Sequence, residues 1–85
     1  ISGMVQGVFF RDSARQAAQS MEITGYVRNL RDGRVEVVAE GEKDSLDKMV
    51  QWCHKGPPAA IVESVDVQNE QYQGEFVLFE VKSSR

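Results

Sequence analysis

The stretch Val5-Gln6-Gly7-Val8-Phe9-Phe10-Arg11 decides the fold, because it joins a short apolar strand to an amphipathic helix. The strand is predicted over residues 1–4, and the helix from residue 10 to residue 21 or 22. Apolar side chains recur in the helix at the i, i+3, i+4 and i+7 spacing of a core-facing stripe, namely at Phe10, Ala14, Ala17, Ala18 and Met21. The small alanines of this stripe predict a close approach of the helix to a sheet.

The same stretch is a candidate anion site. A turn at Gly7 that leads directly into a helix aims several backbone N–H groups at one point, and the positive end of the helix dipole faces the same way. Arg11 adds a planar fork of donors that suits a phosphate or a carboxylate. A cation near the positive end of a helix is unfavourable unless an anion joins it. Taken alone, however, the loop also fits an ordinary glycine turn followed by a solvated arginine.

A β-hairpin is predicted next, with strands over residues 26–30 and 34–40 around Arg31-Asp32-Gly33. An Asp-Gly pair between apolar runs favours a type I′ turn, which needs positive φ at both central positions. Gly25 is expected to interrupt the chain before the hairpin, and Gly41 to end it. In the second strand, three apolar residues alternate with more polar ones and predict one buried face, formed by Val35, Val37 and Ala39.

A second helix is predicted over residues 43–55, and Gly56-Pro57-Pro58 ends it. Its apolar stripe consists of Leu46, Met49, Val50 and Cys53, and Trp52 beside the stripe is expected to pack against the sheet or the edge of a helix. The only histidine, His54, lies in the last turn, where the helix dipole favours its cation, so it is not a candidate catalytic residue. Two further strands are predicted over residues 61–67 and 76–82, the latter with Val77, Phe79 and Val81 on one face, and residues 68–75 form a loop between them.

This order of elements predicts an α+β fold with two helices on one face of a mainly antiparallel sheet of four to five strands. The arrangement is the ferredoxin-like sandwich, a split βαβ unit, and residues 1–85 are expected to form a single domain. The first strand is shorter than a typical strand of about five residues. We therefore expect that residues preceding Ile1 are missing from this sequence.

Composition excludes several classes of protein. The chain has 85 residues, of which 41% are hydrophobic and 27% charged, as in an ordinary globular domain. Its net charge of −3 argues against a general nucleic-acid binder. Neither a signal peptide nor an apolar run of about 20 residues is visible, so no membrane association is expected. Cys53 is the only cysteine, which fits a reducing, cytoplasmic location and predicts an inert packing residue.

Asn29 is a second candidate site residue. Asparagine is depleted in strands, yet Asn29 lies inside a predicted one. An edge position or the beginning of the hairpin turn would explain it. In a split βαβ fold, however, the strand after the first helix can return beside the first strand. That return would bring Asn29 close to the loop that carries Arg11.

These blocks together resemble the acylphosphatase family. Gly3-Met4-Val5-Gln6-Gly7-Val8-Phe9-Phe10-Arg11 is similar to the phosphate-loop signature of the family. Gly25-Tyr26-Val27-Arg28-Asn29, with Asp32-Gly33 and Val35-Glu36-Val37, is similar to its second block, and Trp52 with Gly56-Pro57-Pro58 is similar to the pattern around its second helix. Two positions depart from the family: Phe9 and Glu22 stand where many members have glycine.

The resemblance implies hydrolysis of acyl phosphates to a carboxylate and inorganic phosphate. Because an acyl phosphate has a good leaving group, we expect no metal or cofactor, and we expect the enzyme to be a cytoplasmic monomer. The resemblance further implies that Arg11 binds the phosphoryl group and that Asn29 positions the attacking water. Backbone amides of the loop would complete the phosphate site, and they belong to Gln6, Gly7, Val8, Phe9 and Phe10. No partner beyond a small acyl phosphate and its phosphate product is implied.

Two other functions remain open from the residues alone. The first is a non-catalytic ferredoxin-like module that binds an anionic metabolite or a partner. The second is RNA binding through the open face of the sheet, although the strand over residues 34–40 lacks the aromatic residues that stack on bases. The acyl group of the natural substrate also remains open.

Overall fold

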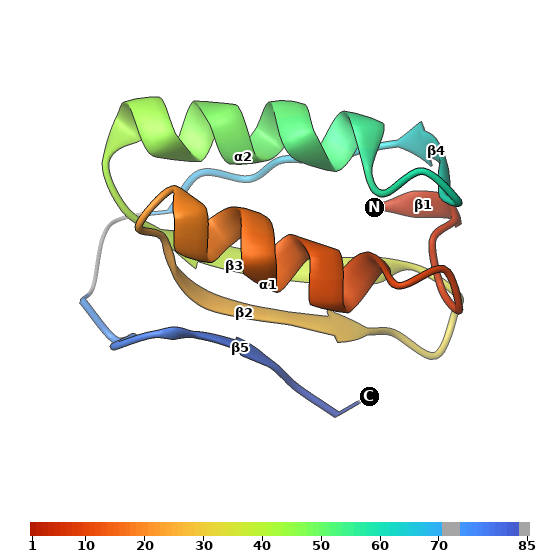
Figure 1. Cartoon of the computed structure of the whole chain (residues 1–85), viewed down its shortest axis with the longest axis horizontal. Helices are drawn as coiled ribbons and strands as arrows, with labels where there is room; N and C mark the ends of the chain where they lie inside the picture. The colour runs from red at the N-terminus through yellow and green to blue at the C-terminus, as the bar shows by residue number, and fades with distance from the viewer. Residues whose placement is uncertain (71–73, 84–85) are drawn as a thin grey trace.

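Two helices lie on the same side of the strands in the computed structural model (Figure 1), which describes residues 1–70 and 74–83. Within these residues the elements follow the predicted order: β1 (Ser2–Met4), α1 (Phe10–Ser20), β2 (Thr24–Asn29), β3 (Val35–Glu40), α2 (Lys43–Lys55), β4 (Ile61–Ser64) and β5 (Phe79–Val81). The ferredoxin-like α+β fold is confirmed. No helix in this part of the chain combines the length and the apolar character needed to cross a bilayer.

The strands form a two-stranded and a three-stranded sheet, and β2 is the central strand of the larger one. It pairs antiparallel with β3 and parallel with β5, while β1 pairs antiparallel with β4. Two hydrogen bonds connect the chain at the start of β1 with β3. The Val35 N–H donates to the Ile1 carbonyl at 2.9 Å, and the Ile1 amino group donates to the Val35 carbonyl at 2.8 Å. The expectation that β2 returns beside β1 is therefore wrong. Its two neighbours are β3 and β5, and β3 is the strand that reaches the start of β1.

The predicted stripes of both helices form the core. Phe10, Ala14 and Ala18 of α1 are buried, and Ala17 and Met21 pack against the core. In α2, whose bounds agree with the prediction, Met49 and Cys53 are buried. The ring of Trp52 meets that of Phe10 edge-on, with centroids 5.3 Å apart, and so joins the two helices.

The hairpin was predicted correctly, but its turn type was not. Gly33 has a φ of +93°, whereas Asp32 is not among the residues with positive φ, so the turn is not type I′. Instead, the Gly33 N–H donates to the Leu30 carbonyl at 3.2 Å and the Leu30 N–H to the Arg34 carbonyl at 2.8 Å. This is a three-residue loop in which glycine takes the left-handed bulge position. The Asp32 carboxylate stabilises it by accepting from the Arg34 N–H at 3.1 Å and Nε at 2.7 Å.

Other predicted boundaries need correction. Gly25 lies inside β2 rather than before it, because only a residue without Cβ can approach the Val38 carbonyl of β3 so closely. Strands β4 and β5 are shorter than the predicted ranges 61–67 and 76–82. Val77 precedes β5 and is 92% exposed, so it does not share the buried face of Phe79. Of the predicted loop 68–75, residues 68–70 and 74–75 contain no strand, and residues 71–73 lie outside the described part.

Candidate active site

The loop between β1 and α1 presents unpaired backbone amides. Gly7 has a φ of +74° and Phe9 a φ of +62°, and α1 begins without a side-chain hydrogen bond to its first N–H groups. Within the part of the chain that the structure describes, the N–H groups of residues 6–12 donate no hydrogen bond. Such a row of free donors at the positive end of a helix dipole is suited to an anion.

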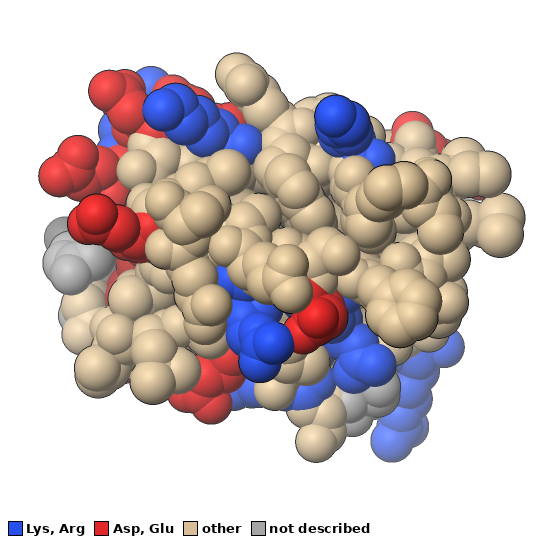
Figure 2. Space-filling view, viewed as in Figure 1, with Lys and Arg blue, Asp and Glu red and all other residues tan. Residues whose placement is uncertain are grey.

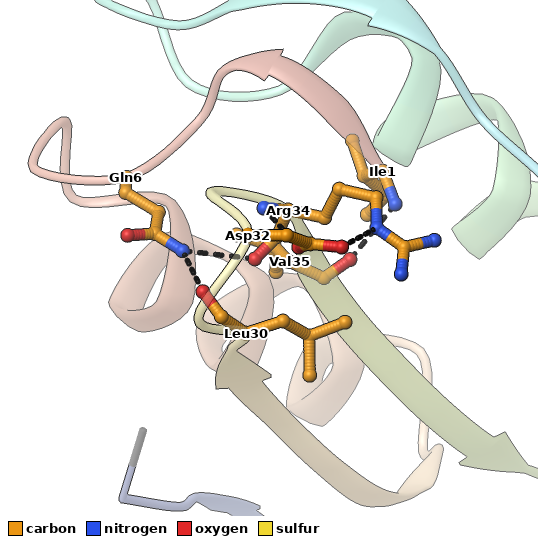
Figure 3. A network of polar contacts seen from close by, with 6 residues as sticks. All are labelled: Ile1, Gln6, Leu30, Asp32, Arg34 and Val35. Atoms are coloured by element: carbon orange, nitrogen blue, oxygen red, sulfur yellow. Dashed lines mark hydrogen bonds and ion pairs between the residues drawn. The ribbon is translucent and has the colours of Figure 1, made fainter. Parts of the chain in front are cut away.

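Gln6 holds this loop in place through its side chain. Its Nε2 donates to the Leu30 carbonyl at 2.7 Å and to the Arg34 carbonyl at 2.9 Å, and so ties the loop to both ends of the β2–β3 turn. Figure 3 shows the Gln6 side chain pointing to these two carbonyls. The side-chain carboxamide of Gln6 therefore binds the hairpin, and the position of the loop depends on the hairpin.

Arg11 is a half-buried cation without a carboxylate partner among the described residues. The nearest acidic residue in the sequence, Asp12, is already engaged, because Arg15 Nη2 donates to its Oδ1 at 2.6 Å. Gln16 Nε2 lies 3.4 Å from the other oxygen of the same carboxylate. The guanidinium of Arg11 thus keeps its donors available for a ligand.

Asn29 is the last residue of β2 and carries an unsatisfied acceptor. Its Oδ1 is buried and has no hydrogen-bond partner among the described residues. A buried polar atom without a partner is costly, by about 1–3 kcal/mol, and such atoms in native proteins are few. The Asn29 side chain therefore carries an acceptor that no other described residue satisfies.

One cavity of about 420 Å³ brings these groups together. It lies where the start of α1 meets the ends of β2 and β5, and its lining residues are Val5, Gly7, Phe9, Phe10, Arg11, Asp12, Arg15, Asn29 and Val81. Of the seven site residues predicted from the sequence, five line the cavity, and Gln6 and Val8 do not. The structure therefore places Arg11 and Asn29 at the same cavity, although β2 does not lie beside β1.

Sequence reasoning missed Arg15 and Val81 as cavity residues. Arg15 could have been found, because it follows Arg11 by four positions and hence shares its helix face. Val81 could not, since only the parallel pairing of β5 with β2, in which Val81 lies opposite Val27, brings it there.

Figure 2 shows that basic side chains gather over the lower part of the face that carries α1, and that most acidic ones on this face lie to the left.

Two other residues with possible chemistry lie away from the cavity. Burial raises the pKa of the Cys53 thiol to about 11, so it stays protonated and unreactive near neutral pH. His54 is exposed and does not line the cavity. Among the described residues, no three His, Cys, Asp or Glu side chains come close enough together to hold a metal ion.

Fold and cavity together define a small ferredoxin-like α+β domain with a loop of unpaired amides beside a half-buried arginine. The family model for acylphosphatase matches residues 1–81. An acylphosphatase of Rubrobacter xylanophilus is 55% identical over 82 residues, which are 96% of this chain and 74% of that protein. One of Acaryochloris marina is 56% identical over 81 residues, 95% of this chain and 86% of that protein.

Solved structures agree with these sequence matches. The crystal structure of acylphosphatase from Bacillus subtilis superposes with a TM-score of 0.92 at 32% identity, and the match covers 95% of this chain and 90% of that one. The chain belongs to the acylphosphatase family, and it is accordingly a hydrolase.

Proposed function

We propose that this chain hydrolyses acyl phosphates to a carboxylate and inorganic phosphate in the cavity at the start of α1. The observation that carries the proposal is the convergence of three unsatisfied groups on that cavity. They are the unpaired guanidinium of Arg11, the side chain of Asn29, whose Oδ1 has no partner among the described residues, and the free amides of the loop residues that line the cavity, Gly7, Phe9 and Phe10. Membership of the acylphosphatase family supports this assignment over a non-catalytic anion-binding module.

The phosphoryl group binds to Arg11 and to the loop in this mechanism. Arg11 supplies two parallel hydrogen bonds and a positive charge. The backbone N–H groups of Gly7, Phe9 and Phe10, which line the cavity, bind the remaining oxygens, and the dipole of α1 adds to their field. The amides of Gln6 and Val8, also predicted for this role, belong to residues that do not line the cavity. Because these donors are fixed by the loop before the substrate arrives, they stabilise the charge on the phosphoryl oxygens without reorganising.

Asn29 orients the attacking water. Its Oδ1 accepts a hydrogen bond from the water and so holds the oxygen in line with the bond to the leaving group. A carboxamide cannot act as a base near neutral pH, so the water gives its proton to an oxygen of the substrate's own phosphate group. The P–O bond to the acyl group breaks as the new P–O bond forms, and the carboxylate leaves with the electron pair. A carboxylate is a good leaving group, and the reaction therefore needs no general acid, metal or cofactor.

The test is a benzoyl phosphate assay, with and without a chelator, on the wild type and on two variants. Arg11→Ala is expected to lose both phosphate inhibition and turnover. Asn29→Ala is expected to retain phosphate inhibition and to lose at least about a hundredfold in kcat, as for other single groups that act in a transition state. Turnover that survives in Asn29→Ala would remove the role of Asn29 as the residue that orients water.

Matched controls are available on the same chain. Arg31→Ala removes an exposed arginine from the hairpin, and Asn69→Ala an exposed asparagine, and neither residue lines the cavity. Both variants are expected to keep wild-type kinetics. Phosphate binding by the wild type without hydrolysis of benzoyl phosphate would instead support a non-catalytic module. Activity that falls with the chelator would contradict the proposed metal-free mechanism.

We also propose that residues 1–85 act as one monomeric domain in the cytoplasm. Support comes from the one hydrophobic core that both helices share with the strands, and from a free, buried cysteine that suits a reducing compartment. Gel filtration of the active protein at two concentrations tests the monomer.

A further inference from the structure

Phe9 has a strained, left-handed backbone conformation and an aromatic side chain exposed to solvent. Its φ of +62° and ψ of +24° put it in the left-handed region, which costs a residue with a Cβ roughly 1–2 kcal/mol. The residue is nevertheless 81% exposed, so burial of the ring in the core does not compensate for the strain. Backbone strain that is maintained at the edge of a functional cavity motivates a search for a functional reason.

The comparison with Glu22 shows that the conformation of Phe9 does not follow from helix geometry. Glu22, with a φ of +58°, is the other described residue with a Cβ in this region. It follows the end of α1, where the Ile23 N–H donates to the Ala18 carbonyl at 2.9 Å and the Glu22 N–H to the Gln19 carbonyl at 3.2 Å. This pattern closes a helix and requires the left-handed conformation. Phe9 lies at the start of α1, where the helix imposes no such conformation, and its positive φ belongs to the loop of unpaired amides. Glycine would adopt this φ without strain, so the loop does not account for a phenylalanine side chain at this position.

The cavity has a polar part and an apolar part. Arg11, Asn29 and the free amides form the polar part, whereas Phe9 and Val81 contribute apolar surface, and Val81 is 39% exposed. An acyl phosphate is divided in the same way, with an anionic phosphoryl group at one end and an organic acyl group at the other. When the phosphoryl group occupies the polar part, the acyl group has the apolar surface of the cavity as its remaining neighbour.

We propose that Phe9 is a specificity-determining residue of this enzyme, and that its ring packs with Val81 against the acyl group and favours aromatic or large apolar acyl phosphates over acetyl phosphate. This inference rests on the proposed function. The contact forms with the bound substrate and persists in the transition state, so its loss raises the KM of an aromatic substrate more than it changes kcat. An offset or edge-on contact between aromatic rings changes affinity by about two- to tenfold.

The experiment compares benzoyl phosphate with acetyl phosphate in the wild type and in Phe9→Gly, Phe9→Leu and Phe9→Tyr. The measured quantity is the ratio of kcat/KM for the two substrates. We expect the ratio to fall about fivefold in Phe9→Gly and less in Phe9→Leu, mainly through a higher KM for benzoyl phosphate. Phe9→Tyr keeps the ring and is expected to restore the wild-type ratio.

Glu22→Gly is the matched control, because it removes the same kind of backbone strain at the other end of α1. It is expected to keep the wild-type ratio. An unchanged ratio in Phe9→Gly, or an equal fall in Glu22→Gly, would overturn the role of Phe9 and leave the proposed hydrolase activity intact. Failure of the wild type to hydrolyse either substrate would overturn the proposed function itself, and the inference about Phe9 with it.

Discussion

At the scale of single residues, Arg11 differs from its neighbours in having no carboxylate to bind. Arg15, Arg28 and Arg34 each form an ion pair, at 2.6 Å with Asp12, 2.7 Å with Glu36 and 2.7 Å with Asp32. Arg31 also lacks a described ion pair, but it is exposed on the hairpin, whereas Arg11 is half-buried in a cavity. The pairing of Asp12 with Arg15 is what leaves Arg11 available, so the acidic residue next to the site does not neutralise it.

Arg11→Lys separates the charge of Arg11 from its geometry. Lysine keeps the positive charge, but its ammonium cannot form two parallel hydrogen bonds to one phosphoryl group. Because one charge-assisted hydrogen bond contributes about 1.5–3 kcal/mol, we expect phosphate to inhibit at least about tenfold more weakly. The inhibition constant of inorganic phosphate measures this effect. Arg31→Lys should leave the constant unchanged, and a wild-type constant in Arg11→Lys would mean that charge alone binds the anion.

At the scale of elements, the site depends on the hairpin between β2 and β3. Asn29 ends β2, and Gln6 attaches the loop before α1 to the turn that follows (Figure 3). A change in the hairpin therefore moves Asn29 and the loop before α1 together.

Gly25→Ala and Gly33→Ala distinguish a steric from a conformational requirement in this hairpin. A Cβ at Gly25 would overlap the Val38 carbonyl oxygen, whereas one at Gly33 would meet nothing within 4 Å. We expect Gly25→Ala to lower the free energy of unfolding by at least about 3 kcal/mol, and Gly33→Ala by about 1–2 kcal/mol through its positive φ alone. Urea denaturation measures both. Equal losses would show that Gly25 is needed only for its backbone conformation.

Asp32 should make the hairpin sensitive to acid. Hydrogen bonds from the Arg34 backbone and side chain lower the pKa of this carboxyl below its ordinary value of 3.8. A group whose pKa is lower in the folded state adds stability above its unfolded pKa and loses it as the pH falls towards the folded value. Asp32→Asn should therefore be less stable than the wild type at pH 7, and the difference should shrink below about pH 4. Urea denaturation from pH 7 to pH 3 tests this, and a difference that does not change with pH would contradict it.

Element by element, the sequence predicted helices better than strands. The bounds of α2 were correct because a 3.6-residue stripe and a Gly-Pro-Pro end mark them locally. Strand β4 was predicted too long, since its apolar alternation continues beyond Ser64, whereas its partner β1 pairs only as far back as Ser2. The extent of a strand depends on its partner, which local sequence does not reveal.

The same limit applies to the site. Arg11 and the glycine turn carry local signals, and Asn29 was conspicuous as a polar residue in a strand. Their shared cavity was expected for an incorrect reason, because β2 pairs with β3 and β5 and not with β1. Val81 reaches the cavity only through the pairing of β5 with β2, so the apolar part of the site could not be predicted before the topology was known.

At the scale of the whole molecule, the net charge of −3 opposes the approach of an anionic substrate. Binding must therefore come from the short-range field of the cavity, to which Arg11, Arg15 and the end of α1 contribute. A ligand captured in this way binds only the folded chain, because the unfolded chain does not hold the loop amides and the guanidinium together. The proposed binding of phosphate would hence be coupled to global stability.

Inorganic phosphate should protect the wild type against thermal unfolding. At one hundred times its dissociation constant, a ligand specific for the folded state adds about 2.7 kcal/mol, which raises the Tm of a domain of this size by on the order of 10 °C. Phosphate also stabilises proteins generally, because it is excluded from their surface. Arg11→Ala separates the two effects: it should retain only the general stabilisation, while Arg31→Ala should behave as the wild type. An equal rise of Tm in all three proteins would show that phosphate does not bind at Arg11.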